Sequence, residues 1–292
     1  AGARRGTRAE SVRVRREGRA EEDGYSSGLI PGVRASADAR RLAQEIAFSA
    51  VRLNVLDIEP PGLYGEAQAL ASSDLERASW ICFLLAYLAP LEGQDPFAGV
   101  REVLEQAPTL SFEGPLPTLE GVALGPRSSH VPGRGADTLV AYRQWVERSS
   151  QPASQASALV GDASWSAERR FERLLERLTL PGLGRAGRYE LLVTLGRLGL
   201  FELHAGSLHL AATGPSTGED PATVAAKRVF GIGDPLLLDR RAGALAEAVG
   251  VPVEALDLAL FNWGSAQRAS AGVAEPDVAD GVLERAEAAL GI

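Results

Sequence analysis

Hydrophobic and polar positions follow a helical period along most of the chain. Residues 37–57 (ADARRLAQEIAFSAVRLNVLD) place Leu42, Ile46 and Leu53 near helical spacing, so they predict an amphipathic helix. Residues 72–92 (SSDLERASWICFLLAYLAPLE) begin with Ser and Asp cap candidates and then become apolar on nearly every face. A helix that is apolar all round belongs inside a protein, so this segment predicts a central buried helix.

Further segments carry the same period, some with cap candidates. They are residues 95–106, 136–150, 165–178, 187–200, 220–231, 234–250, 251–264 and 275–292. The first is expected to begin with Asp95 as N-cap and Pro96 at the first helical position. Residues 107–135 lose the period and are rich in Pro and Gly, which predicts a long loop. Residues 201–212 (FELHAGSLHLAA) alternate apolar and polar positions, which predicts a short β-hairpin.

These elements predict a mainly α protein with one small hairpin. Three parts are expected: a flexible Arg-rich arm over 1–35, an N-terminal helical subdomain with the long loop over 36–160, and a C-terminal helical subdomain over 161–292. The arm is assigned because its residues show no apolar period and hold many Gly, Ser and Arg residues.

Composition narrows the class of protein. Apolar residues make up 45% of the 292 residues and charged residues 23%, which is typical of a folded globular protein. The longest apolar run, residues 80–91, is too short for a bilayer, which needs about 20 residues. Cys82 is the single cysteine, so no internal disulfide can form. With one cysteine and only three histidines, no metal site is expected. We therefore expect a cytoplasmic protein, without a membrane span, a metal or another cofactor.

The charge is unevenly distributed. Residues 1–20 hold seven arginines and two glutamates, a local +5, so a net charge of −8 leaves −13 on the remainder. Bulk charge therefore does not indicate nucleic-acid binding, although the basic arm can bind phosphates or remain solvated. Several enzyme motifs are absent from the sequence: a GxxxxGK[ST] loop, a GxSxG elbow and HExxH.

The sequence LPGLGR, residues 180–185, is the first candidate for chemistry. A Gly-rich turn before a helix exposes successive backbone N–H groups, which bind a phosphate without reading bases. Gly182, Gly184, Arg185 and Arg188 are therefore candidate DNA phosphate contacts. The alternative is a plain interhelical turn in which the glycines supply positive φ.

The order of residues 214–250 resembles the helix-hairpin-helix DNA glycosylases. A Gly-rich turn, a helix ending in Phe230-Gly231 and an apolar approach precede an Asp at the start of an Arg-bearing helix. In that superfamily the catalytic Asp lies roughly 20 residues past the last glycine of the hairpin, and Asp239 is 21 residues past Gly218. Asp234 and Asp257 are competing candidates. The alternative for Asp239 is an exposed helical carboxylate paired with arginine.

Residues 160–265 show a closer resemblance. The order SWSAERRFERLLERL, GRYELLVTLGRLGL, AAKRVFGIGD, RRAGALAEAVGVP and LDLALFNWG is similar to the alpha-glutamyl/putrescinyl thymine pyrophosphorylase family. That family is associated with hypermodified bases in phage DNA, and its relatives include glycosylase-like enzymes that excise modified bases as phage defence. The resemblance implies a helix-hairpin-helix glycosylase-like fold, double-stranded modified phage DNA as partner, and a chain that acts as a monomer.

The resemblance also implies roles for particular residues. A carboxylate near the sugar C1′ would stabilise the oxocarbenium-like transition state after the nucleotide leaves the stack. Lys227 is the only lysine and does not fall at the superfamily's Schiff-base position, so a water-using, monofunctional glycosylase is expected. Asn262 and Trp263 are candidates for the base pocket. Lys227, Arg240 and Arg241 are additional candidate phosphate contacts, with solvated helix faces as the alternative.

Two other functions compete with base excision. Residues 170–212 have the helix-turn-helix-hairpin order of a winged helix, which would make the protein a non-catalytic DNA-binding protein. The family name also implies a base-hypermodifying transferase acting on a pyrophosphorylated hydroxymethyl pyrimidine in DNA.

Overall fold

The helical periods of the sequence become helices in a computed structural model, which describes residues 20–212, 220–274 and 280–292. The helices are α1 (Ser36–Ile58), α2 (Gly62–Ala69), α3 (Leu75–Leu88), α4 (Ala98–Gln106), the 3₁₀ turn η1 (Pro132–Arg134), α5 (Asp137–Ser149), α6 (Gln155–Leu159), α7 (Ala167–Arg177), α8 (Arg185–Arg197), α9 (Pro221–Phe230), α10 (Pro235–Val249), α11 (Ala255–Gly264) and α12 (Asp280–Leu290). The protein is therefore mainly helical. None of the helices described is long and apolar enough to cross a bilayer.

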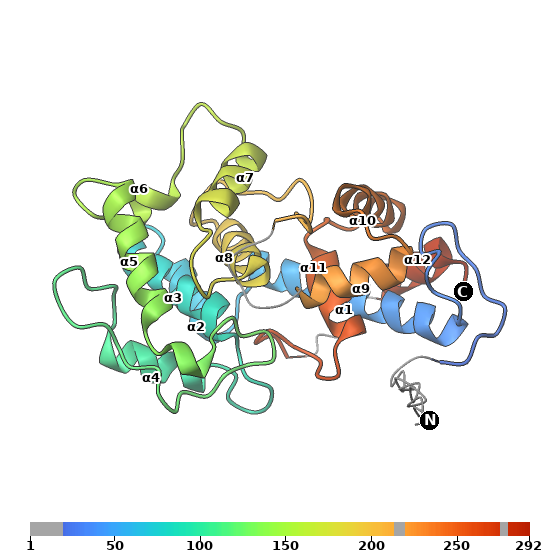
Figure 1. Cartoon of the computed structure of the whole chain (residues 1–292), viewed down its shortest axis with the longest axis horizontal. Coiled ribbons are helices and arrows are strands. Elements are labelled where there is room, and N and C mark those ends of the chain that lie inside the picture. Colours follow the sequence, from blue (N-terminus) through green and yellow to red (C-terminus); the bar gives the residue numbers. More distant parts are fainter. Residues whose placement is uncertain (1–19, 213–219, 275–279) are drawn as a thin grey trace, which may run out of the picture.

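The helices form two groups that share one core. In Figure 1, α2–α8 lie on the left and α9, α10 and α12 on the right, while α1 reaches from the right side to the middle. Helix α1 packs along α11 and α12, and α3 packs against α8. Helix α1 lies before residue 160 in the sequence, whereas α11 and α12 lie after it, so this packing joins segments from both sides of the expected subdomain boundary. That boundary stays a prediction.

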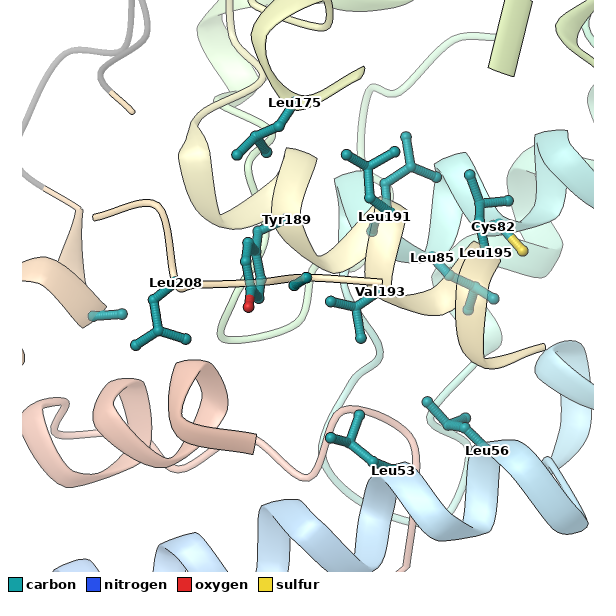
Figure 2. Close-up of a cluster of buried hydrophobic side chains, with 14 of the residues drawn as sticks. Leu53, Leu56, Cys82, Leu85, Leu175, Tyr189, Leu191, Val193, Leu195 and Leu208 are labelled. Carbon is teal, nitrogen blue, oxygen red and sulfur yellow. The ribbon is translucent and has the colours of Figure 1, made fainter. Parts of the chain in front are cut away.

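Helix α3 is the buried helix that its composition predicts. Asp74 caps its N-terminus by accepting a hydrogen bond from the backbone N–H of Arg77 at 3.0 Å. Every residue from 78 to 88 is buried, including the single cysteine, Cys82. Figure 2 shows Cys82 and Leu85 of this helix among apolar side chains of α1 and α8. Burial raises the pKa of the Cys82 thiol well above its usual range.

Several local predictions need correction. Helix α4 begins at Ala98 rather than at Pro96, because Asp95 accepts from Phe97 N–H at 3.3 Å and pairs with Arg101, which makes residues 95–97 a turn before the helix. Helix α2 and the short helix α6 lie in segments for which no helix was predicted. The predicted long loop at 107–135 is confirmed, apart from η1.

The predicted flexible arm is wrong for its last residues. Ile30 is fully buried and Val33 is 3% exposed, both within the main core. The Tyr25 hydroxyl donates to the Leu290 carbonyl at 2.6 Å, which fixes this segment to the last helix. Two apolar side chains without a period suffice to anchor an extended segment. Residues 1–19, with most of the predicted arm's arginines, lie outside the described residues.

The predicted hairpin at 201–212 is also wrong, since these residues form a loop without a β-ladder. The alternation reflects burial of alternate side chains, whereas the backbone groups bind side chains of neighbouring helices. Arg185 Nη1 donates to the Leu208 carbonyl at 3.0 Å, and Leu210 N–H donates to both oxygens of Asp239 at 3.1 and 3.2 Å. The winged-helix hypothesis took this hairpin as its wing, and residues 201–212 do not form one.

Candidate functional site

The turn between α7 and α8 is held in one conformation by glycine and by α5. Leu180 and Leu183 form an isolated antiparallel bridge, and Gly182 has φ +80°. The Thr138 hydroxyl on α5 donates to the Pro181 carbonyl at 3.0 Å. A Cβ at residue 182 would lie 2.2 Å from Thr138 Oγ1, so only glycine fits there.

This turn borders a pocket of about 250 Å³. Four segments surround it: the loop that contains η1, the turn with the start of α8, the start of α9, and α11. The lining residues are Pro126, Arg127, Ser128, Ser129, Val131, Arg134, Gly182, Gly184, Arg185, Ala186, Asp220, Pro221 and Phe261. A pocket of this size, with converging charged groups, is the strongest candidate site in the described part of the chain.

Arg185 links three segments of the pocket wall. Its Nε lies 3.0 Å from Asp220 Oδ2, and its Nη2 lies 2.6 Å from Asp257 Oδ1. Its side chain is 2% exposed and that of Asp257 is 3% exposed, so the ion pair is shielded from water. Burial alone would lower the pKa of Arg185, but the carboxylates of Asp257 and Asp220 outweigh it and raise that pKa. Arg185 is therefore charged and fixed.

The ion-pair network continues away from Arg185. Arg127 Nη2 lies 2.5 Å from Asp257 Oδ2, and Arg127 Nη1 lies 3.1 Å from Glu190 Oε2. Glu190 also pairs with Arg52 of α1. Burial would raise the pKa of Asp257, yet the guanidiniums of Arg185 and Arg127 hold it below its usual range. The network connects the pocket wall to the helix core.

Asp220 is the acidic residue in the pocket lining, and one of its oxygens is held by three donors. As N-cap of α9, its Oδ2 accepts from Thr223 N at 2.8 Å, from Thr223 Oγ1 at 2.9 Å and from Arg185 Nε at 3.0 Å. Its Oδ1 accepts no hydrogen bond from any described residue, and the side chain is 15% exposed. The carboxylate is thus oriented, with one oxygen available to a ligand.

Two positively polarised groups of the pocket are not matched by carboxylates. Arg134 lines it and forms no salt bridge with the described residues. Gly184 is the N-cap of helix α8 and offers no side-chain hydrogen bond to the first N–H groups of the helix. A helix N-terminus without a cap carries a partial positive charge. The pocket is therefore suited to an anionic group.

The predicted phosphate contacts of the turn divide into two kinds. Gly182, Gly184 and Arg185 line the pocket. Arg188 does not, because it is 1% exposed and donates to the carbonyls of Leu175 and Ala212 and to a threonine hydroxyl. Its guanidinium holds neighbouring backbone in place, and its contact with DNA stays a prediction.

The three predicted carboxylates lie in different surroundings, none in the pocket lining. Asp257 is bound by two arginines, as described. Asp234 is the exposed N-cap of α10 and accepts from two backbone N–H groups. Asp239 lies half-buried in the second turn of α10, where burial raises its pKa and the hydrogen bond from Leu210 N–H partly offsets this. Spacing along the chain thus did not identify the carboxylate at the pocket.

The predicted base-pocket residues belong to the packing around α1. Asn262 donates to Glu45 Oε2 at 2.9 Å and accepts from Ala269 N–H at 2.8 Å, so its amide is occupied. Trp263 donates to the Asp38 carbonyl at 3.0 Å and is 5% exposed. Both polar groups thus bind the protein's own backbone and side chains, and neither residue lines the pocket, so their role at a base stays a prediction.

The remaining predicted phosphate contacts lie on α9 and α10. Lys227 is partly buried in the last turn of α9 and does not line the pocket. Arg240 is exposed, and Arg241 donates to the Gly28 carbonyl at 3.0 Å. None of the three lies at the pocket, so their contact with DNA stays a prediction.

The residues that the sequence analysis missed are Arg127, Arg134 and Asp220. Asp220 did carry a signal, because Asp-Pro at the start of an apolar stripe predicts an N-cap. The two arginines lie in the long Pro- and Gly-rich loop, whose segment GPRSSHVPGR holds two cations close together. Long loops with charged residues are often functional, so the composition of this loop was the available signal.

The fold and the pocket define a helical protein with a charged site between a Gly-rich turn and a capped helix. Residues 129–269 match the model of the family alpha-glutamyl/putrescinyl thymine pyrophosphorylase clade 3. This match confirms the family resemblance seen in the sequence, and its range includes the turn, Arg134, Arg185, Asp220 and Asp257. No curated protein and no solved structure shows a significant match to the chain.

Proposed function

We propose that this protein is a monofunctional DNA glycosylase that removes a modified pyrimidine from phage DNA and leaves an abasic site, as a defence against phage. The observation that carries the proposal is the pocket in which Asp220 is held by Arg185 and Thr223 beside cationic groups. The match to a family named for modified thymines supports a modified base as the target. The turn and α8 support a helix-hairpin-helix arrangement on DNA.

The chemistry follows from the placement of Asp220. The target nucleotide would leave the stack and enter the pocket of about 250 Å³. As the N-glycosidic bond breaks, its electron pair leaves with the base and positive charge develops on the sugar, which the free oxygen of Asp220 stabilises. Water adds its oxygen to C1′, and its proton passes through the carboxylate to solvent or to the departing base. Arg185 and Thr223 bind the other oxygen of Asp220, Oδ2, and so orient the carboxylate.

Asp220 takes the role that the sequence analysis gave to Asp239, Asp234 or Asp257. Asp257 acts in this proposal as a positioning residue, because it holds Arg185, which in turn holds Asp220. No lysine lines the pocket, so we propose hydrolysis rather than a Schiff base, with Lys227 outside the chemistry.

The test uses purified protein with double-stranded DNA from phages that carry hypermodified or glucosylated pyrimidines, and with unmodified DNA. Alkali-labile abasic sites are expected only on a modified DNA, with intact strands before alkali. Asp220→Asn should lower the excision rate at least about 10²-fold and keep DNA binding, because Asn also caps a helix. Asp234→Asn, which changes a cap away from the pocket, is the matched control. No abasic sites on any modified DNA would overturn the proposal.

A second candidate is transfer chemistry on a pyrophosphorylated hydroxymethyl pyrimidine. The family name contains the word pyrophosphorylase, and the unmatched Arg134 with the start of α8 suits a pyrophosphate. The two functions differ in product. A transferase leaves the base in DNA with a changed mass, whereas a glycosylase releases it, so nucleoside mass spectrometry after the reaction distinguishes them.

A further inference from the structure

We infer that the pocket selects a pyrimidine whose 5-substituent carries a negative charge, and that Arg134 is the residue that recognises this charge. The inference rests on the proposed function, since it names the class of base that the same pocket accepts. It depends on the balance of charges around the pocket, which the ion pairs fix.

The ion-pair network beside the pocket is balanced by itself. Its guanidiniums belong to Arg52, Arg127 and Arg185, and its carboxylates to Glu190, Asp220 and Asp257. Three positive and three negative charges cancel, so the network contributes no net charge. Arg134 lies outside it and forms no ion pair within the described ranges. The pocket thus has one positive charge in excess.

A further group points to an anion as the ligand. Gly184, the N-cap of α8, lines the pocket and offers no side-chain hydrogen bond to the first N–H groups of the helix. An uncapped helix start carries a partial positive charge and favours a negative one. An anion in the pocket would meet this charge as well as that of Arg134.

A cationic substituent would meet the opposite conditions. Asp220 is the one acidic residue among the described residues that line the pocket, and its Oδ2 is already bound by three donors. Its remaining oxygen is required at the sugar in the proposed reaction. An ammonium group would therefore meet the unbalanced charge of Arg134 and find no free carboxylate, so its binding is disfavoured.

A backbone phosphate has the same chemistry as a charged substituent, so the experiment must separate the two. Duplexes of one sequence would carry a single 5-hydroxymethyluracil, 5-carboxyuracil or 5-aminomethyluracil, which are neutral, anionic and cationic at neutral pH and similar in size. Kd is measured by fluorescence anisotropy at fixed salt, and excision is scored in parallel. The wild type should bind the carboxyl duplex about tenfold more tightly than the neutral one, and the amino duplex most weakly.

The variants assign this preference to Arg134. Arg134→Gln should abolish the preference for the carboxyl duplex and leave Kd for the neutral duplex within about twofold. Arg240→Gln, which changes an exposed arginine of α10, should keep the preference. If Arg134→Gln weakens all three duplexes equally, Arg134 binds a backbone phosphate and the inference is overturned. Equal Kd values in the wild type would overturn it as well.

The outcome is separable from that of the proposed function. Excision of the neutral base with no charge preference would keep the glycosylase and remove the inference. A carboxyl preference without excision of any base would keep the selection of charge and remove the glycosylase.

Discussion

Arg185 and Asp257 are separated by 72 residues in sequence, yet Arg185 Nη2 donates to Asp257 Oδ1 at 2.6 Å inside the protein. The pair joins the first turn of α8 to the first turn of α11, and both side chains are at most 3% exposed. Since Arg185 also orients Asp220, this single contact links the packing of two helices to the candidate catalytic carboxylate.

Asp257→Asn should therefore be strongly destabilising. The change removes the carboxylate that Arg185 and Arg127 share and leaves the buried network with one uncompensated positive charge, so the free energy of unfolding should fall by about 3–5 kcal/mol. Glu202→Gln is the control, because Glu202 pairs with Arg170 but is 81% exposed, and it should cost less than about 1 kcal/mol. Urea unfolding followed by circular dichroism measures both. Equal losses would contradict the assigned importance of the buried network.

Gly182→Ala tests the turn beside the pocket. Alanine at φ +80° is strained, and its Cβ would also clash with Thr138 Oγ1. Gly199→Ala is a matched control, since Gly199 has φ +69° with open space around it and should cost only about 1–2 kcal/mol. The clash should add about 1–3 kcal/mol for Gly182→Ala. Equal melting temperatures for the two variants would show that the turn is not in close contact with Thr138 of α5.

The pKa of Asp239 predicts a sign for the pH dependence of stability. Burial raises this pKa above its ordinary value of 3.8, so the folded state holds the proton more tightly than the unfolded state. As pH rises from about 4 through the folded pKa, the folded state loses that advantage and stability falls. Relative to Asp239→Asn, the wild type should thus lose stability across this range in urea titrations. A wild type that gains stability relative to the variant would contradict the burial of Asp239.

Trp263→Phe separates the packing around α1 from the pocket. The indole N–H donates to the Asp38 carbonyl, and losing this bond with part of the ring should cost about 1–3 kcal/mol. Because Trp263 does not line the pocket, Kd for modified DNA and the excision rate at a temperature where the variant is folded should be unchanged. A selective loss of excision in the stable variant would return Trp263 to the base pocket.

Helices such as α1 and α7 could be predicted because their apolar faces repeat with a helical period, and α3 because a cap candidate precedes a segment that is apolar on nearly every face. The alternation of residues 201–212 was misleading, since side chains of Arg185 and Asp239, rather than a second strand, bind this backbone. A period describes which side chains are buried and says nothing of where backbone hydrogen bonds go.

The site was only partly predictable. LPGLGR identified the turn and Arg185, because those residue types fix local backbone geometry. The choice among Asp239, Asp234 and Asp257 depended on counting from Gly218, which lies outside the described residues. Asp220 is recognised by its contacts with Arg185 and the pocket, and contacts between distant segments leave no mark in the spacing of one sequence.

Cys82 gives the protein a built-in reporter. It is the single cysteine of the chain, it lies in the centre of α3, and burial holds its thiol in the protonated, unreactive form. A thiol reagent can reach it only when the core around α3 and α8 opens, so with fast reclosing the labelling rate in native buffer equals the equilibrium constant for opening times the intrinsic labelling rate. Every variant proposed above can thus be compared by the kinetics of one covalent adduct per molecule, without denaturant and without an introduced probe.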